Sequence, residues 1–402
     1  MARCLLLAEG DARTFNSWSG ISQQVVVGLE RAGHSVINAN CDLSGLTRYV
    51  AAAASWAPER KRWWVRYHLG RTSFKLRSRR AALAVREHSD EVDYILQFGG
   101  TFNPGDTRGL PVFLYCDGNA ALSLAGISGG QSEASFLSSR EIRGVLERES
   151  RVYSKATRIF TFSDRLTKSF RNDFALPPDR VRTVFAGANL DPNRVMIDWD
   201  SRARNFPTIL FLGRDFQRKG GDILLEAFFR VRNRFPKARL VIAGCTPDIG
   251  TESGVEVFGK IDRDSETGDQ LIHDLFSRAS VFCMPTRFEG LSISFLEAMC
   301  FSLPCIAASS AWSPAEMIHE GVIGFTVEVD DVEQLASRLE ALCADPARAA
   351  SMGEAGRSRA LDHFTWNSVI GKMIGDIDAH LQGKERGDHP KRADLRPKGF
   401  SE

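Results

Sequence analysis

Two cations follow a short apolar run in the segment ILFLGRDFQRKGG, Ile209 to Gly221. Arg214 comes directly after Gly213, and Lys219 stands five residues later, beside a glycine pair that is predicted to open a helix. Glycine lets a ligand approach the backbone, and a helix start flanked by two cations is suited to bind a diphosphate. Short glycine and lysine motifs also recur by chance, so a solvated charged loop explains this segment equally well.

Two glutamates flank a second predicted strand-to-helix turn, in the segment CMPTRFEGLSISFLEAM, residues 283–299. Glu289 and Gly290 lie in the loop, a helix is predicted to begin near Ser292, and Glu297 stands about one turn inside it. Backbone N–H groups at a helix start point toward an anion and favour it through the helix dipole. Here they belong to Leu291, Ser292 and Ile293. Because a second anion-binding segment is present, we interpret the first segment as part of an anion site rather than as a solvated loop.

Short apolar runs alternate with amphipathic stretches along the whole chain, which predicts parallel strands joined by helices and an α/β fold. In the second half, residues 222–235 place apolar side chains at spacings of three and four, as on one face of a helix. The predicted strands of this half are Ile209–Leu212, Leu240–Ala243, Val255–Phe258, Ser280–Met284, Pro304–Ala307 and Phe325–Val329.

The first half shows the same alternation, with a predicted helix at Gln23–Ala32 that Gly33 ends. Its predicted strands are Cys4–Ala8, Val36–Asn38, Tyr94–Phe98, Val112–Tyr115, Arg158–Phe162 and Val181–Phe185. Asp191–Pro207 is polar, holds two prolines and lacks sustained periodicity, so we place the domain boundary there. The segment 383–402 is rich in Lys, Arg, Pro and Gly and is predicted to be a disordered tail.

Composition narrows the class of protein. With 43% hydrophobic and 25% charged residues, the 402-residue chain has the balance of a globular enzyme rather than of a disordered or fibrous protein. The eight cysteines form no CxxC pair and no zinc-type spacing, which favours buried thiols in a reducing compartment, the cytoplasm. No stretch approaches the ~20 apolar residues of a membrane-spanning helix.

Taken together, these segments resemble the donor site of family 4 glycosyltransferases, which are retaining enzymes of the GT-B fold. Arg214 and Lys219 match the family's arginine and lysine, and Glu289 and Glu297 match its E-x7-E pair. Further matches in the right order are Ala186–Asn189, Glu316, Gly324 and His363–Trp366. The resemblance implies two Rossmann-like domains facing each other across a cleft.

The implied domains have these bounds: 1–190, which binds the acceptor; 207–365, which binds the nucleotide sugar; and 366–382, a helix crossing back to the first domain.

The resemblance also implies roles for these residues. Glu297 holds the nucleotide ribose, Glu289 holds a hydroxyl of the donor sugar, and Arg214 and Lys219 neutralise the leaving phosphates. Positive charge is needed where negative charge develops as a nucleoside diphosphate departs. Because no Asp-x-Asp stands where it would bind a metal with the donor, we expect a metal-independent reaction with no cofactor.

The sequence departs from the family pattern in two places. Trp18-Ser19-Gly20 replaces the frequent glycine pair of the first turn, so Gly20 either approaches the donor phosphate or is a simple turn glycine. Many relatives carry a histidine near the reacting carbon where this chain reads YCDGNA, residues 115–120. Asp117 is the candidate substitute, but it equally suits a helix cap or a turn with Gly118.

The segment 59–80 carries nine Lys and Arg residues among Trp63, Trp64, Tyr67 and Phe74. Such a mixture suits an anionic membrane surface or a lipid-phosphate acceptor. The alternative is a solvated helix whose aromatic residues belong to the core. Nucleic acid is not expected, because no base-reading motif accompanies the charge. The nine cations are Arg60, Lys61, Arg62, Arg66, Arg71, Lys75, Arg77, Arg79 and Arg80.

The sequence therefore predicts a retaining transferase that moves a sugar from a UDP- or GDP-sugar to a glycan or lipid-linked acceptor, in surface polysaccharide or glycoconjugate synthesis. We expect it in the cytoplasm, at the inner face of the membrane if the basic segment binds lipid. Two alternatives remain: a GT-B nucleotide-sugar epimerase and a non-catalytic sugar-nucleotide-binding module. A dinucleotide-binding Rossmann protein is disfavoured because the first turn lacks G-x-G-x-x-G.

Overall fold

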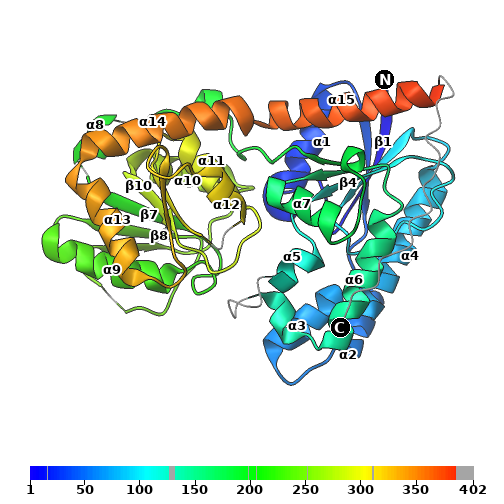
Figure 1. The fold of residues 1–402 in the computed structure, drawn as a ribbon, viewed down its shortest axis with the longest axis horizontal. Helices are drawn as coiled ribbons and strands as arrows, with labels where there is room; N and C mark the ends of the chain where they lie inside the picture. Colours follow the sequence, from blue (N-terminus) through cyan, green and yellow to red (C-terminus); the bar gives the residue numbers. More distant parts are fainter. Residues whose placement is uncertain are drawn as a thin grey trace. The chain divides into compact units, whose positions relative to one another are not determined.

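The chain folds into two compact units, each a parallel sheet with helices packed around it (Figure 1). The computed structural model describes residues 1–15, 17–125, 132–197, 199–204, 206–250, 252–309 and 312–385. Unit 1 comprises Met1–Phe185 together with the chain from Val369 onward, and unit 2 comprises Ala186–Ser368.

Unit 1 contains a six-stranded sheet of order β2-β1-β3-β4-β5-β6 in which all neighbours are parallel. Leu5 pairs with Ile37 on one side and with Ile95 on the other. The central strands are buried, as expected for a parallel sheet covered on both faces. The strands are β1 (Arg3–Ala8), β2 (Ser35–Asn40), β3 (Tyr94–Phe98), β4 (Val112–Cys116), β5 (Arg158–Thr161) and β6 (Val181–Thr183).

Helices connect most strands of unit 1, with a three-helix insertion between β2 and β3 and a direct connection without an α-helix from β3 to β4. That insertion consists of α2, α3 and α4 and holds most of the basic segment. The helices are α1 (Ile21–Arg31), α2 (Gly45–Ala54), α3 (Arg60–Leu69), α4 (Arg71–His88), α5 (Ala120–Ala125), α6 (Ser139–Tyr153) and α7 (Asp164–Asn172).

Unit 2 repeats the architecture with the strand order β12-β11-β10-β7-β8-β9, again with parallel neighbours. The strands are β7 (Thr208–Leu212), β8 (Arg239–Ala243), β9 (Val255–Phe258), β10 (Val281–Met284), β11 (Cys305–Ala308) and β12 (Gly324–Val327). All twelve predicted strands are confirmed, with ends that shift by one or two residues. The α/β prediction and the GT-B fold are confirmed as well.

The helices of unit 2 are α8 (Trp199–Arg204), α9 (Gly221–Arg234), α10 (Glu266–Arg278), α11 (Ile293–Cys300), α12 (Trp312–Met317), α13 (Val332–Ala344) and α14 (Pro346–His363). The predicted helix at 222–235 is α9, and its predicted apolar face is the buried one: Leu224, Ala227, Phe228 and Val231 are at most 1% exposed. Helix α13 packs beside α9, and α14 packs against α11.

The polar stretch 191–207, the predicted boundary, falls within unit 2. Its short helix α8 is held there by Arg202, whose guanidinium donates to the carbonyl oxygens of Phe276, Ser277, Phe301 and Ser302. Burial lowers the pKa of Arg202 to about 10. The chain changes units at Phe185, ahead of the prolines, because a buried cation fixes the segment to the ends of α10 and α11.

Helix α15 (Trp366–Glu385) begins in unit 2 and joins unit 1 from Val369 onward. It buries Val369, Ile370, Met373 and Ile377 in unit 1, and its Asp376 lies 2.6 Å from Arg158 Nη1 and 2.5 Å from Arg182 Nη1. The helix extends three residues into the predicted tail, whose remainder, 386–402, lies outside the described residues. None of the described helices is long and apolar enough to cross a membrane.

Candidate functional site

The two segments that carry the predicted donor site start at neighbouring strand ends. Strands β7 and β10 pair in parallel, with Ile209 opposite Val281, so the loops that follow them leave the same edge of the sheet. Ligands of open parallel sheets bind at this edge, outside the carboxyl ends of the strands. The tertiary structure therefore brings together residues that are about 70 positions apart in the chain.

Two glycines let the first loop pack tightly. A Cβ on Gly213 would stand 2.4 Å from Cδ of Lys219, so only glycine lets the lysine cross the end of β7. Gly220 has a φ of +73° and begins α9, and a Cβ there would stand 2.1 Å from the carbonyl oxygen of Pro285. The predicted glycines are thus needed for packing between the two loops, which positions Lys219.

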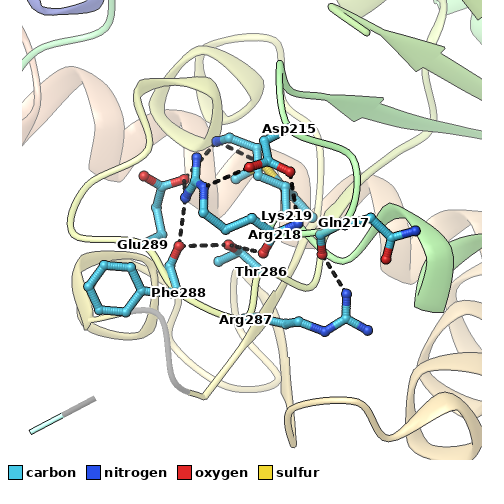
Figure 2. Close-up of polar contacts among 9 residues, drawn as sticks. Asp215, Gln217, Arg218, Lys219, Thr286, Arg287, Phe288 and Glu289 are labelled. Atoms are coloured by element: carbon cyan, nitrogen blue, oxygen red, sulfur yellow. Dashed lines mark hydrogen bonds and ion pairs between the residues drawn. The ribbon is translucent and has the colours of Figure 1, made fainter. Parts of the chain in front are cut away.

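Lys219 and Glu289 form the centre of the site. The lysine Nζ lies 2.7 Å from Oε2 of Glu289 and 3.5 Å from the sulfur of Met284. The lysine and glutamate side chains are 12% and 14% exposed, so both are largely enclosed but open to a ligand. Figure 2 shows the two groups approaching each other from the loops after β7 and β10. The sequence placed each of these residues in a site but did not predict their direct contact.

Arg218 is a third cation in this cluster, and the sequence analysis missed it. Its Nη1 donates to the carbonyl oxygen of Phe288 at 2.7 Å and lies 3.4 Å from Oε2 of Glu289 (Figure 2). Glu289 therefore has two cations within reach. The Arg-Lys pair in the sequence was the available signal, but spacing alone does not show that both side chains turn to one carboxylate.

Arg214 lies apart from this ion pair. It is exposed, and it makes no hydrogen bond or ion pair with any residue among those the structure describes. Its position directly after Gly213 keeps it at the carboxyl edge of the sheet. Arg214 therefore has a full complement of donors to offer to a ligand.

Helix α11 begins where the sequence predicted. Its first helical residue is Ile293, and Ser292 is the N-cap residue with extended backbone. The Ser292 side chain does not cap the helix. Because the first N–H groups of a helix have no intrahelical acceptor, this start favours an anion. Gly290 and Leu291 lie in the preceding loop, on the same side as Glu289.

Glu297 has a cation partner that the sequence analysis did not identify. Its side chain is fully buried, and its Oε1 lies 2.6 Å from Nη1 of Arg263. Burial raises the pKa of the Glu297 carboxyl, while Arg263 acts in the opposite direction. Arg263 lies in the loop between β9 and α10, flanked by Asp262 and Asp264, and no spacing rule links it to residue 297.

Arg287 holds the second loop against α9. Its guanidinium bonds both carboxylate oxygens of Asp222, at 2.8 and 2.9 Å, and its Nε lies 2.6 Å from Asp330. It also donates to the carbonyl oxygen of Gln217, and Figure 2 shows it directed there rather than to Glu289. A bidentate arginine–carboxylate pair is geometrically specific, so Arg287 fixes the loop that carries Glu289.

Gly20 and Asp117 belong to unit 1. Gly20 has a φ of +82° and is the N-cap residue of α1, and Trp18 and Ser19 before it also have positive φ. Asp117 follows β4 and is exposed. Asn119, not Asp117, caps α5, because its Oδ1 accepts from the N–H of Leu122 at 2.9 Å.

The basic segment 59–80 is not one continuous charged face. Arg77 is fully buried, and its Nη2 lies 2.8 Å from Oε2 of Glu9, to which Thr101 also donates. Tyr67 lies under the Arg77 guanidinium, and Phe74 lies under Arg148. This part of the segment belongs to the interior of unit 1, as in the core alternative, whereas Arg60, Lys61 and Arg62 are exposed.

The eight cysteines are free, and seven of them are buried. Among the described residues, no group of three or more His, Cys, Asp or Glu side chains is arranged to hold a metal ion. The site thus consists of the cations, carboxylates, glycines and helix start described above.

Comparisons with known proteins show which families and folds this chain is similar to. Residues 197–359 match the model of the family described as glycosyl transferases group 1. A GDP-mannose-dependent alpha-(1-6)-phosphatidylinositol monomannoside mannosyltransferase of Mycolicibacterium smegmatis is 33% identical over 56% of this chain and 64% of its own. An MMP alpha-(1->4)-mannosyltransferase of Mycolicibacterium hassiacum is 26% identical over 58% of this chain and 56% of its own. The chain thus spans little more than half the length of these curated relatives.

The fold is shared over a longer stretch. The structure of sucrose-phosphate synthase from Thermosynechococcus elongatus superposes with a TM-score of 0.69, covering 96% of this chain and 100% of that one at 16% identity. The predicted donor-site segments lie inside the residues that match the glycosyl transferases group 1, and the two-sheet fold is that of GT-B glycosyltransferases.

Proposed function

We propose that this protein is a retaining glycosyltransferase that moves a hexose from a nucleoside diphosphate sugar to a glycan or lipid-linked acceptor. The observation that carries the proposal is the ion pair between Lys219 and Glu289 beside the uncapped start of α11. It places an ammonium group, a carboxylate and helical N–H groups at one edge of one sheet, which suits a diphosphate joined to a sugar.

The chemistry follows from charge. As the bond between the sugar and the diphosphate breaks, the leaving group takes the bonding electron pair and gains negative charge. Lys219, Arg218 and Arg214 supply positive charge on that side, while Glu289 accepts a hydrogen bond from a sugar hydroxyl. Electrostatic stabilisation of this kind commonly contributes about 10²- to 10³-fold per donor group.

The names of the relatives support a choice of sugar and base to test first. Both curated relatives described above are named as mannosyltransferases, and one is named as GDP-mannose-dependent. We therefore propose GDP-mannose as the first donor to test, with UDP-sugars next. The phosphatidylinositol mannoside named for the first relative makes a lipid-linked acceptor the first acceptor to test.

The test is a hydrolysis and transfer screen over GDP-, UDP- and ADP-sugars. Wild type is expected to turn over one donor, and Lys219→Ala and Arg214→Ala to lower turnover by about 10²- to 10³-fold. Arg230→Ala is the matched control, because Arg230 is a half-exposed cation on α9 with carboxylate partners outside the site. Wild-type rates in both Lys219→Ala and Arg214→Ala would exclude this phosphate site. Turnover of donor into an isomer without acceptor would indicate an epimerase.

We also propose that no metal takes part, because three cations and a helix start are available to the diphosphate. Turnover is expected to be unchanged by EDTA at a concentration that inactivates a magnesium-dependent transferase in parallel. Restoration of a lost activity by added Mg²⁺ or Mn²⁺ would contradict this.

In unit 1, we propose that Asp117 lies near the reacting carbon and that Gly20 approaches the donor phosphate. Asp117 is the exposed residue directly after a central strand, and Gly20 begins a helix. Asp117→Asn is expected to lower kcat with little change in nucleotide affinity. A large loss of nucleotide binding instead would contradict a role for Asp117 near the reacting carbon.

A membrane-facing surface on α2 and α3 would bring the enzyme to a lipid-linked acceptor at the inner face of the membrane. Six of the twelve large apolar side chains that are exposed among the described residues fall within residues 46–64. They are Leu46, Tyr49, Val50, Trp56, Trp63 and Trp64, with Arg60, Lys61 and Arg62 beside them in sequence. Exposed tryptophans with cations suit an anionic bilayer surface.

Flotation with phosphatidylcholine vesicles, with and without phosphatidylglycerol, tests this surface. Binding is expected to need the anionic lipid and to be lost in Arg60→Gln/Lys61→Gln/Arg62→Gln and weakened in Trp56→Ser/Trp64→Ser. The control is Arg230→Gln/Arg234→Gln/Arg239→Gln on exposed cations of unit 2. Equal partition of the α3 variant and the control would reject the membrane contact. Arg77 is left intact, because it is buried.

A further inference from the structure

The Glu297 carboxylate is held by one oxygen only. Its side chain is fully buried at the first turns of α11, and Oε1 receives the 2.6 Å bond from Arg263. Oε2 is buried as well and has no hydrogen-bond partner in the part of the chain that the structure describes. Leaving a buried carboxylate oxygen without a hydrogen bond costs free energy. A ligand that donates a hydrogen bond to this oxygen would therefore bind favourably.

Arg263 bridges two parts of unit 2. Its side chain is 12% exposed, Nη1 bonds Glu297, and Nη2 donates to the backbone carbonyl of Asn189 at 3.3 Å. A planar guanidinium bonded at both ends has a fixed orientation, and so does the carboxylate it contacts.

Asn189 is itself fixed by the segment that leads out of unit 2. Its Oδ1 accepts from Nε1 of Trp366 at 3.2 Å, and the neighbouring Ala188 N–H donates to the carbonyl of Phe364 at 3.1 Å. A Cβ on Gly187 would stand 2.5 Å from the backbone nitrogen of Trp366. The orientation of Arg263 therefore depends on the residues by which the chain enters and leaves unit 2.

We propose that Arg263 is a positioning residue for the nucleotide ribose: it fixes the Glu297 carboxylate through Oε1 and leaves Oε2 to accept a ribose hydroxyl. This inference rests on the proposed function. Arg263 acts through Glu297, and its anchor on Asn189 sets the direction of the acceptor oxygen.

A double-mutant cycle between protein and ligand tests this role. Binding is measured by calorimetry for GDP or UDP, whichever wild type binds more tightly, and for its 2′,3′-dideoxy analogue. Arg263→Met is expected to weaken binding of the ribonucleotide by about 10- to 100-fold and that of the analogue by less than about 3-fold. Arg263→Lys is expected to recover part of the loss, because the ammonium keeps part of the contact that fixes the carboxylate. Arg278→Met is the control, since Arg278 pairs with Asp274 on the neighbouring α10.

Equal weakening for the ribonucleotide and its dideoxy analogue would show a merely structural role and overturn the inference. Failure of wild type to bind either nucleoside diphosphate would instead count against the proposed function. If Arg263→Met does not fold, Arg263→Met/Glu297→Gln removes the unpaired buried charge, and it is expected to bind the two nucleotides with affinities within about 3-fold of each other. A marked preference of that variant for the ribonucleotide would also overturn the inference.

The anchor on Asn189 has its own test. Trp366→Phe removes the Nε1 donor and keeps most of the ring, and it is expected to weaken ribonucleotide binding by about 2- to 5-fold without affecting the analogue. Unchanged ribonucleotide binding would show that the contact with Asn189 does not orient Arg263.

Discussion

In each unit, a glutamate in a loop near the carboxyl ends of the strands pairs with a cation. The two pairs differ in how far the cation is buried. In unit 1, Glu9 follows β1 and meets Arg77 at 2.8 Å, and the arginine is fully buried. In unit 2, Glu289 meets Lys219 at 2.7 Å, and both side chains keep more than a tenth of their surface exposed. The glutamates are similarly exposed, at 18% and 14%, but only in the second pair is the cation open to a ligand.

The surroundings of each pair explain the difference. Arg77 also donates to the carbonyl of His68, and Thr101 occupies the other oxygen of Glu9. These bonds tie the helical insertion to the sheet of unit 1. Around Glu289, Lys219 keeps part of its surface exposed, and no side chain caps the start of α11 among the described residues. Burial thus separates a structural ion pair from one that can be exchanged for a ligand.

The largest effect is expected at Arg77. Arg77→Met removes the buried cation and leaves the partly enclosed Glu9 without it, and breaking a buried pair commonly costs about 3 to 5 kcal/mol of unfolding free energy. Urea denaturation measures it. Arg77→Met/Glu9→Gln removes the charge as well and is expected to recover more than half of the loss. A stability near that of wild type in Arg77→Met alone would show that the pair is not structural.

Glu149 extends the comparison to a buried carboxyl that forms no ion pair within 4.0 Å among the described residues. It accepts from the N–H of Ala120 at 2.8 Å, and burial raises its pKa to about 7. Between the unfolded pKa of about 4.5 and about 7, the folded state binds more protons, so this group lowers stability as pH rises through that window.

Glu149→Gln keeps an acceptor and removes the titration. Relative to wild type, its unfolding free energy is expected to rise by on the order of 2 to 3 kcal/mol from about pH 5 to about pH 8. Urea denaturation at both pH values checks this, with Glu147→Gln on the same helix as the control. A difference between variant and wild type that does not change with pH would contradict the raised pKa.

Arg218 is expected to have a smaller effect, on catalysis rather than on stability. Because it is about a third exposed and reaches Glu289 at 3.4 Å, Arg218→Ala is expected to lower turnover by about 10-fold, equivalent to about 1.4 kcal/mol. Steady-state kinetics measures it beside Lys219→Ala. A loss of turnover as large as that of Lys219→Ala would contradict this smaller role and show that Arg218 contributes as much to catalysis as Lys219.

The smallest effect on stability is expected at the Lys219–Glu289 pair, because a second cation stays beside the glutamate. Lys219→Met keeps Arg218 beside Glu289, so the unfolding free energy is expected to change by less than about 1 kcal/mol. Denaturation of Lys219→Met beside Arg77→Met completes the comparison. A loss comparable to that of Arg77→Met would erase the distinction between the two pairs.

The sequence by itself determined the strands, the principal helices and the turns that carry chemistry. Apolar runs such as Ile209–Leu212 and the glycines at 213 and 220 act locally, because burial and backbone conformation depend on residue type and near neighbours. The start of α11 near Ser292 was predictable for the same reason. The resemblance then added the roles of Glu289 and Glu297, which no local rule supplies.

Only the tertiary structure decided the partners. Lys219 meets Glu289, Glu297 meets Arg263, and Arg77 meets Glu9, each across loops or helices far apart in the chain. The sequence shows ten arginines and lysines within residues 44–80, but not that one of them is buried. An ion pair depends on distance and burial, and both are set by the packing of whole elements rather than by spacing along the chain.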